Sequence, residues 1–287
     1  MKAGADRIAE AFKAACRDEL DAPKPGNVHV FADGHRMTAA DFLRSADAAA
    51  GPLSVPGTRV GARILAAVEA TFAAVGTNTN LGIILLCAPL AAAAEDDVVD
   101  LRMAVARVLD ALDEEDASLA FRAIVRASPA GLGRIPFNDV HAPAAVTLKQ
   151  AMADARERDR IARQYVSGFS DIFELGLPLL EEARSQTVDP KWATLRVYLA
   201  FLATLPDTHI VRKYGPPLAE AVRQAATQFR HRLGAGKPSD ALITELLFWD
   251  SDLKASNINP GTSADLTVAT LFAHRLRNVL PSSRNNG

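Results

Sequence analysis

Apolar residues recur at intervals of three and four positions along most of this chain of 287 residues. In Gly61–Val75, for example, Ile64, Val68 and Phe72 follow this spacing, which places them on one face of an α-helix. A chain with this pattern buries its apolar faces by packing helices against one another. The same pattern predicts further helices over Asp6–Leu20, Thr38–Ala50, Asp97–Leu112, Glu115–Arg126, Ala144–Phe173, Pro190–Thr204, Pro217–Leu233, Asp240–Trp249 and Ser263–Val279.

A β-sheet is not predicted, because only Val28–Phe31 has an extended pattern, and it could pair only locally. Aromatic residues are few and alanine is abundant, which favours closely packed helices. We therefore predict an all-α fold: a single compact multi-helix domain over residues 1–280, followed by a disordered tail at 281–287. The break at Ser128–Pro136 is interpreted as a long loop inside this domain, with a domain linker as the alternative.

Charge and cysteine content restrict the partners and the compartment. The formal net charge of −2 gives no field that would attract nucleic acid or an anionic membrane. Cys16 and Cys87 lie on different predicted helices and are expected to be buried thiols. The longest apolar run, Leu81–Ala94, contains Pro89 and is shorter than the ~20 residues that span a bilayer, so we expect a buried core helix. Met1–Glu10 has no apolar signal core, which favours a cytoplasmic protein.

Four polar loops interrupt the helical pattern, at Pro23–His29, Gly76–Gly82, Leu205–Gly215 and Asn257–Asp265. They are rich in amides, hydroxyls, glycine and charged groups, unlike the segments that they connect. We expect the four loops to converge on one site for a nucleotide and a metal ion.

The charged residues of these loops suit a metal–phosphate site. Asp207 and Asp265 could hold Mg²⁺ through carboxylate oxygens, as a hard cation prefers. Lys24, Arg212 and Lys213 could neutralise phosphate. The alternative for the Leu205–Gly215 loop is a solvated turn in which Asp207 caps the next helix.

Uncharged groups complete the predicted site. Gly76–Leu81 and Gly261–Leu266 share the form G-T-(N/S)-x-(N/D)-L before an apolar segment, so each could present backbone N–H groups to an anion at a helix start. Two ordinary N-caps are the alternative. His209 and His35 are the candidates for moving a proton, and Asp207 is assigned to catalysis with them. The uncharged residues assigned to nucleotide binding are Gly26, Asn78, Asn80, Gly261 and Ser263.

Several motifs occur together in the order of a known family. They are Lys24-Pro25-Gly26, Gly34-His35-Arg36-Met37 with Phe42 and Ser45, Gly76-x-Asn78-Thr79-Asn80, Asp207-Thr208, and Asn257-x-x-Pro260-Gly261-x-Ser263-Ala264-Asp265-Leu266. Taken together, they resemble the triphosphoribosyl-dephospho-CoA synthase family over most of the chain. The resemblance implies a helical enzyme that joins ATP to dephospho-CoA with release of adenine.

The chain departs from the family pattern in two loops. Family enzymes typically read G-x-N-T-H-K-G, whereas Asn80 and Leu81 stand here in place of the histidine and the lysine. Thr208–Lys213 stands where those enzymes have an Asn-rich loop ending in His-Arg-Gly-Gly. This pattern resembles a divergent branch found in one-carbon and tetrahydromethanopterin contexts, whose acceptor need not be dephospho-CoA.

Three functions follow as hypotheses. The first is an ATP- and Mg²⁺-dependent transferase in which an acceptor hydroxyl attacks ribose C1 as adenine leaves. The second is a sibling ribosyl- or phosphoribosyl-type transferase acting on a pterin-like acceptor. The third is a non-catalytic helical nucleotide-binding protein. The expected partners are small molecules, namely ATP and a nucleotide- or pterin-like acceptor, with no nucleic acid and no membrane, and a homodimer is possible.

Overall fold

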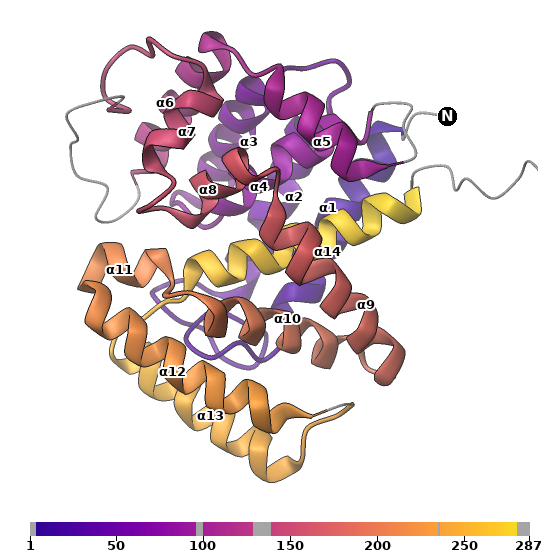
Figure 1. Ribbon diagram of the computed structural model, residues 1–287, viewed down its shortest axis with the longest axis vertical. Coiled ribbons are helices and arrows are strands. Elements are labelled where there is room, and N and C mark those ends of the chain that lie inside the picture. Colours follow the sequence, from indigo (N-terminus) through magenta and orange to yellow (C-terminus); the bar gives the residue numbers. More distant parts are fainter. Residues whose placement is uncertain (1–3, 96–99, 129–138, 235, 280–287) are drawn as a thin grey trace, which may run out of the picture.

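The structure is a computed structural model that describes residues 4–95, 100–128, 139–234 and 236–279 (Figure 1). All regular elements in these ranges are helices, which confirms the predicted all-α class. They are α1 (Ala5–Leu20), α2 (Ala39–Ser54), α3 (Val60–Val75), α4 (Leu81–Ala93), α5 (Leu101–Asp110), α6 (Glu114–Ala127), α7 (Leu148–Ala155), α8 (Arg160–Ser167), the π-helix η1 (Asp171–Gly176), α9 (Leu177–Gln186), α10 (Pro190–Thr204), α11 (Thr208–Tyr214), α12 (Pro216–Leu233), α13 (Asp240–Ala255) and α14 (Gly261–Val279).

Helix α14 holds the helices together from the inside. It runs between α2–α8 on one side and α9–α13 on the other (Figure 1), and it packs against α1, α4, α10 and η1. Its apolar residues from Leu266 to Leu276 are buried. Each Å² of apolar surface removed from water stabilises the fold by about 25 cal/mol. The first turn of α14, which contains Asp265, is therefore held in the interior.

Two clusters of buried apolar side chains make up the core. The larger one is built mainly from α1–α9 and α14, and the smaller one from α10–α13. Helix α10 contributes to both, with Val197 and Phe201 in the larger cluster and Leu195 and Leu199 in the smaller. The single domain over residues 1–280 stays a prediction, and the predicted tail at 281–287 lies outside the described residues.

The predicted helix over Ala144–Phe173 is divided into α7, α8 and η1. Asp159 begins α8, because its side chain accepts hydrogen bonds from the first free N–H groups of that helix. Gly168 ends α8 in the left-handed conformation, with φ of 63°. The predicted loop break at Ser128–Pro136 falls almost wholly outside the described residues, which stop at Ser128 and resume at Asp139.

Three local predictions are confirmed. The extended piece pairs only locally, through bridges between His29 and Ala32 and, just beyond it, between Gly34 and Met37. Cys16 and Cys87 are buried and form no disulfide. Leu81–Ala93 is a buried core helix that continues through Pro89. Within the described ranges, every helix is too short or too polar to cross a membrane.

Candidate active site

A pocket of about 880 Å³ lies where several helices begin. This volume suits a ligand the size of a nucleotide. Its apolar lining residues include Phe42, Phe72, Leu85, Phe121, Ile124 and Met152. Its polar lining residues, together called the polar wall, include Glu19, Asn27, Asn78, Arg158, Asp159, His209, Arg212, Asn259, Thr262 and Asp265.

Four helices start at the polar wall. Leu81 of α4, Asp159 before α8, His209 of α11 and Gly261 of α14 all line the pocket. A helix start carries partial positive charge and N–H groups without partners inside the helix, so it favours a bound anion. The convergence of the polar loops predicted from the sequence is therefore present, and its electrostatics suit phosphate.

Asp265 is a pocket carboxylate that has no partner among the residues that the structure describes. Its side chain lines the pocket, and within the described residues it accepts no hydrogen bond and forms no ion pair. Burial raises the pKa of Asp265 well above its usual value, and the nearby charges of Asp207, Glu19 and Asp159 raise it further, while Arg212 opposes them. A cation from a ligand would relieve this penalty, which makes Asp265 the strongest candidate for metal contact.

Gly82 gives Asp265 its space. A Cβ atom at position 82 would overlap the carboxylate of Asp265 and would press on Ile161. We expect Gly82→Ala to displace the carboxylate and to lower turnover at least about tenfold, since small misplacements of reacting groups are costly. Gly51→Ala, whose added Cβ meets nothing within 4 Å, is the matched helical control. Steady-state assays of both variants test this, and equal activity in the two would contradict it.

Asp207 is saturated by hydrogen bonds. One oxygen accepts from the N–H groups of His209 and Ile210, at 2.9 and 3.3 Å, and so caps α11. The other accepts from the N–H and the hydroxyl of Ser263, both at 2.8 Å, at the start of α14. Burial raises the pKa of Asp207, although these donors oppose the shift. In this arrangement Asp207 joins two helix starts, and a metal ion would have to displace existing donors.

His209 lies in the pocket and is held in its neutral form. Burial, together with the charges of Arg212, Lys213 and His35, lowers the pKa of His209 from 6.5 to about 4. Its ring lies against Gly261, where an added Cβ would overlap Nδ1. Neutral imidazole can donate one hydrogen bond and accept another, so it can assist a proton transfer.

The lowered pKa of His209 has a consequence for stability. The unfolded chain takes up a proton at this residue below about pH 6.5, whereas the folded protein does so only near pH 4. This stabilising contribution is therefore present above pH 6.5 and is lost as the pH falls toward 4. The free energy of unfolding should fall between pH 7.5 and pH 4.5, and we expect His209→Gln to make this fall smaller by on the order of 1–2 kcal/mol. Urea unfolding at the two pH values measures it, and identical pH dependence in both proteins would contradict it.

Of the three cations predicted to bind phosphate, Arg212 lines the pocket, while Lys24 and Lys213 do not. Lys24 is completely buried, where it forms an ion pair with Glu19 and donates to Asn27 at 3.0 Å. Lys213 lies over the ring of Tyr214 and is exposed. Arg212 also contacts Asp159 at 3.4 Å, so it links the starts of α8 and α11.

The remaining predicted residues hold the polar loops in shape, and of those named next only Asn78 lines the pocket. His35 contacts the carbonyl of Gly26 through Nε2 at 2.8 Å, and Gly26 has φ of 81°, which favours glycine. Asn78 lines the pocket and accepts from the N–H of Leu81 at 3.1 Å. Asn80 precedes α4, is buried, and has an Nδ2 atom without a hydrogen-bond partner in the described structure. The roles assigned to these residues stay predictions.

Sequence reasoning missed Glu19, Arg126, Arg158 and Asp159, which all line the pocket. Asp159 lay inside an apparently continuous helical run, although an Asp followed by apolar residues is a helix-start signal. Glu19 lies at the end of α1, where a solvent-facing acid would be the usual expectation. Burial raises the pKa of Glu19, with Lys24 opposing the shift.

The fold and pocket define an all-helical protein with a nucleotide-sized pocket at converging helix starts. The sequence matches the CitG family, ATP:dephospho-CoA triphosphoribosyl transferase, over residues 5–284. The chain therefore belongs to this family, as its loop motifs predicted.

Individual relatives carry related names. The 2-(5''-triphosphoribosyl)-3'-dephosphocoenzyme-A synthase of Klebsiella pneumoniae is 32% identical over 148 residues, 51% of each chain. The protein of the same name from Pectobacterium atrosepticum is 36% identical over 104 residues, 36% of this chain and 32% of its own. These matches span about half or less of the curated relatives' length. A crystal structure from Archaeoglobus fulgidus, provisionally named triphosphoribosyl-dephospho-CoA synthase, superimposes with a TM-score of 0.64 at 27% identity, covering 80% of this chain and 96% of that chain.

Proposed function

We propose that the protein transfers the triphosphoribosyl group of ATP to a hydroxyl group of an acceptor, with dephospho-CoA as the first candidate. The bond between ribose C1 and adenine breaks, a bond from C1 to the acceptor oxygen forms, and the hydroxyl proton is balanced by protonation of the departing adenine. The observation that carries the proposal is the carboxylate of Asp265, which has no partner among the described residues and lies where four helix starts converge, in a chain of this family.

The triphosphate fits the polar wall of the pocket. Arg212 and Arg158 both line it, and the starts of α8 and α14 add the partial positive charge of their helix dipoles. Arg158 donates to the carbonyl of Asp154 at 2.7 Å and has no carboxylate partner in the described structure. Arg158 can therefore take phosphate oxygens without first breaking an ion pair, whereas Arg212 would bind phosphate beside Asp159, which lies 3.4 Å away.

The carboxylates of the pocket fit Mg²⁺ bound together with ATP. The described residues contain no group of three or more His, Cys, Asp or Glu side chains placed to hold a metal ion alone. Mg²⁺ usually takes one or two carboxylates, with the other positions filled by phosphate and water, and Asp265 supplies one free carboxylate. Asp159 is the second candidate, because it also lines the pocket. When bound, the ion would offset negative charge on the triphosphate.

His209 is the side chain best placed to move a proton. It lines the pocket, whereas His35 contacts Gly26 behind the pocket wall. A bound triphosphate would favour the protonated form of His209 and raise its pKa from about 4, toward the range useful at neutral pH. We assign His209 as the acid or base and Asp207 as a residue that supports the two helix starts.

Leu81 leaves two chemical classes of acceptor to be tested, dephospho-CoA and pterin-like molecules. Its side chain lines the pocket where the family pattern has a lysine, so this wall offers apolar contact in place of a charge. This departure favours testing pterin-like acceptors beside dephospho-CoA. The cytoplasmic location and the homodimer stay predictions.

Adenine release from ATP and Mg²⁺, with and without dephospho-CoA, tests the proposal. Chromatography with mass detection should show free adenine together with a triphosphoribosyl adduct of the acceptor. If adenine appears only with another acceptor, the transferase chemistry stands and the acceptor is revised. Folded protein that binds ATP and releases no adenine with any acceptor would refute the proposal.

A further inference from the structure

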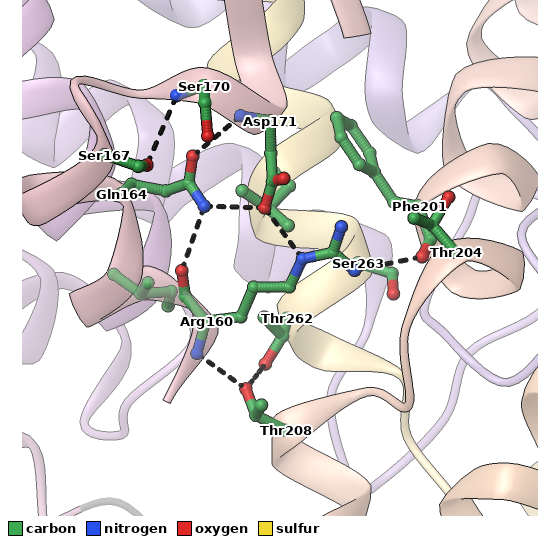
Figure 2. Close-up of polar contacts among 12 residues, drawn as sticks. Arg160, Gln164, Ser167, Ser170, Asp171, Phe201, Thr204, Thr208, Thr262 and Ser263 are labelled. Atoms are coloured by element: carbon green, nitrogen blue, oxygen red, sulfur yellow. Dashed lines mark hydrogen bonds and ion pairs between the residues drawn. The ribbon is translucent and has the colours of Figure 1, made fainter. Parts of the chain in front are cut away.

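Hydroxyl groups join three of the helix starts at the pocket (Figure 2). The backbone N–H of Arg160, the first residue of α8, donates to Oγ1 of Thr208 at 3.3 Å. Oγ1 of Thr208, the first residue of α11, lies 3.1 Å from Oγ1 of Thr262 in the first turn of α14. The N–H at a helix start has no partner inside its own helix, so Thr208 caps a helix other than its own.

The neighbours of these three residues line the pocket. Asp159 precedes Arg160, His209 follows Thr208, and Gly261 precedes Thr262, which itself lines the wall. A change in the distance between any two helix starts would therefore move pocket groups relative to one another. Thr208 is not among the lining residues, so it can act on the pocket only through its neighbours.

The side chain of Arg160 fixes this junction to the rest of the fold (Figure 2). It is buried, and its Nε donates to Asp171 Oδ2 at 2.8 Å while its Nη1 donates to the carbonyl of Phe201 at 3.2 Å. Gln164 donates to the same Asp171 oxygen at 2.7 Å. Helix α8 is thereby tied to η1 and α10, and the hydroxyl pair extends this anchor to α11 and α14.

We propose that Thr208 is a positioning residue for the reaction, acting with Thr262 to set the spacing of the starts of α8, α11 and α14. The inference rests on the proposed function of the pocket. Asp207 already joins α11 to α14 through Ser263. The Thr208 hydroxyl adds α8 to these two helices through the N–H of Arg160, beside the longer contact of 3.4 Å between Arg212 and Asp159. The pair thus aligns Asp159 with His209 and Asp265.

Thr208→Val removes the hydroxyl with little change of shape and is the first test. We expect kcat for adenine release to fall about tenfold or more, with a smaller change in KM for ATP, because the groups are misplaced and not removed. Thr208→Ser keeps the hydroxyl and should restore most of the activity. Thr267→Val on α14 is the control, because its buried hydroxyl donates within its own helix, to the carbonyl of Ser263 at 2.8 Å.

A double-mutant cycle tests the pairing. Thr262→Val should resemble Thr208→Val, and the double variant should be little worse than the worse single variant, since the two hydroxyls act through one contact. Independent, additive losses would overturn the pairing. Equal losses in Thr208→Ser and Thr208→Val, or in Thr267→Val, would overturn the positioning role.

Binding separates this inference from the proposed function. Calorimetric titration with ATP and Mg²⁺ should show weaker binding, or an altered enthalpy, in Thr208→Val and not in Thr267→Val or Thr208→Ser. If the variants differ in binding in this way and the wild-type protein shows no turnover, the positioning role of Thr208 is upheld and the transferase function is refuted. Turnover in the wild type with unchanged kcat in Thr208→Val would uphold the transferase and refute the junction.

Discussion

Replacing Asp265 with asparagine should abolish adenine release and, at neutral pH, make the protein more stable. The carboxylate has no protein partner in the described structure, and its neighbours Asp207, Glu19 and Asp159 are acidic. An amide of the same shape removes the buried charge but is a poor ligand for a cation, so turnover should fall by a factor of about 100 or more. Stability is exchanged for function at this position.

The effect of Asp265 on stability depends on pH, and its sign follows from the raised pKa. Because its pKa is raised in the folded protein, the unfolded chain loses this proton first as the pH rises above about 3.8, and the folded state is then penalised. The melting temperature of Asp265→Asn should match the wild type near pH 3.8 and exceed it at pH 7.5, by roughly 2–4 °C per kcal/mol. Asp252→Asn, at an exposed position on α13, controls for charge alone. A variant that keeps its turnover, or that is less stable at pH 7.5, would contradict the assignment.

Replacing Asp207 with alanine should give the largest loss of stability. The change leaves the N–H groups of His209, Ile210 and Ser263 without their acceptor in a buried place, besides the hydroxyl of Ser263. Buried donors without partners cost about 1–3 kcal/mol each, so we expect a loss of about 3 kcal/mol or more in the free energy of unfolding.

Asp100→Ala is the matched control for this prediction. Asp100 caps α5 alone, through the N–H groups of Arg102 and Met103, and lies at the surface. An ordinary cap of this kind contributes about 1 kcal/mol. Urea unfolding of both variants measures the difference. Equal losses would mean that Asp207 is only a cap for α11, the alternative that its loop sequence left open.

The helices of this protein could be predicted because burial on one helix face leaves a periodic trace in the sequence. The bounds Pro190–Thr204 were obtained this way, and Ser263–Val279 begins only two residues inside α14. The start of α8 could not be predicted in this way, because the apolar pattern continues across Asp159. Only the capping hydrogen bonds of Asp159 mark the break. The meeting of the four polar loops was also predictable, since polar loops between apolar helices collect at the surface or around a pocket.

The individual roles within the site could not be predicted, because they depend on contacts between distant residues. Asp207 and Asp265 looked equivalent in sequence, yet His209, Ile210 and Ser263 saturate the first, while the second has no partner among the described residues. Lys24 looked like a phosphate ligand, but Glu19 reaches it across the end of α1 and holds it in the core. Local sequence patterns indicated the candidate groups, but their roles follow from the packing of α11 against α14 and from the burial of Lys24 beside α1.

A crystal structure of the protein with ATP and Mg²⁺, without acceptor, would test the central claim most directly. We predict the triphosphate at the starts of α8, α11 and α14, with Arg212 and Arg158 on its oxygens and Asp265 on the cation. The hydroxyls of Thr208 and Thr262 should remain paired in that complex. Nucleotide bound elsewhere, or bound here with Asp265 turned away from the cation, would contradict the account.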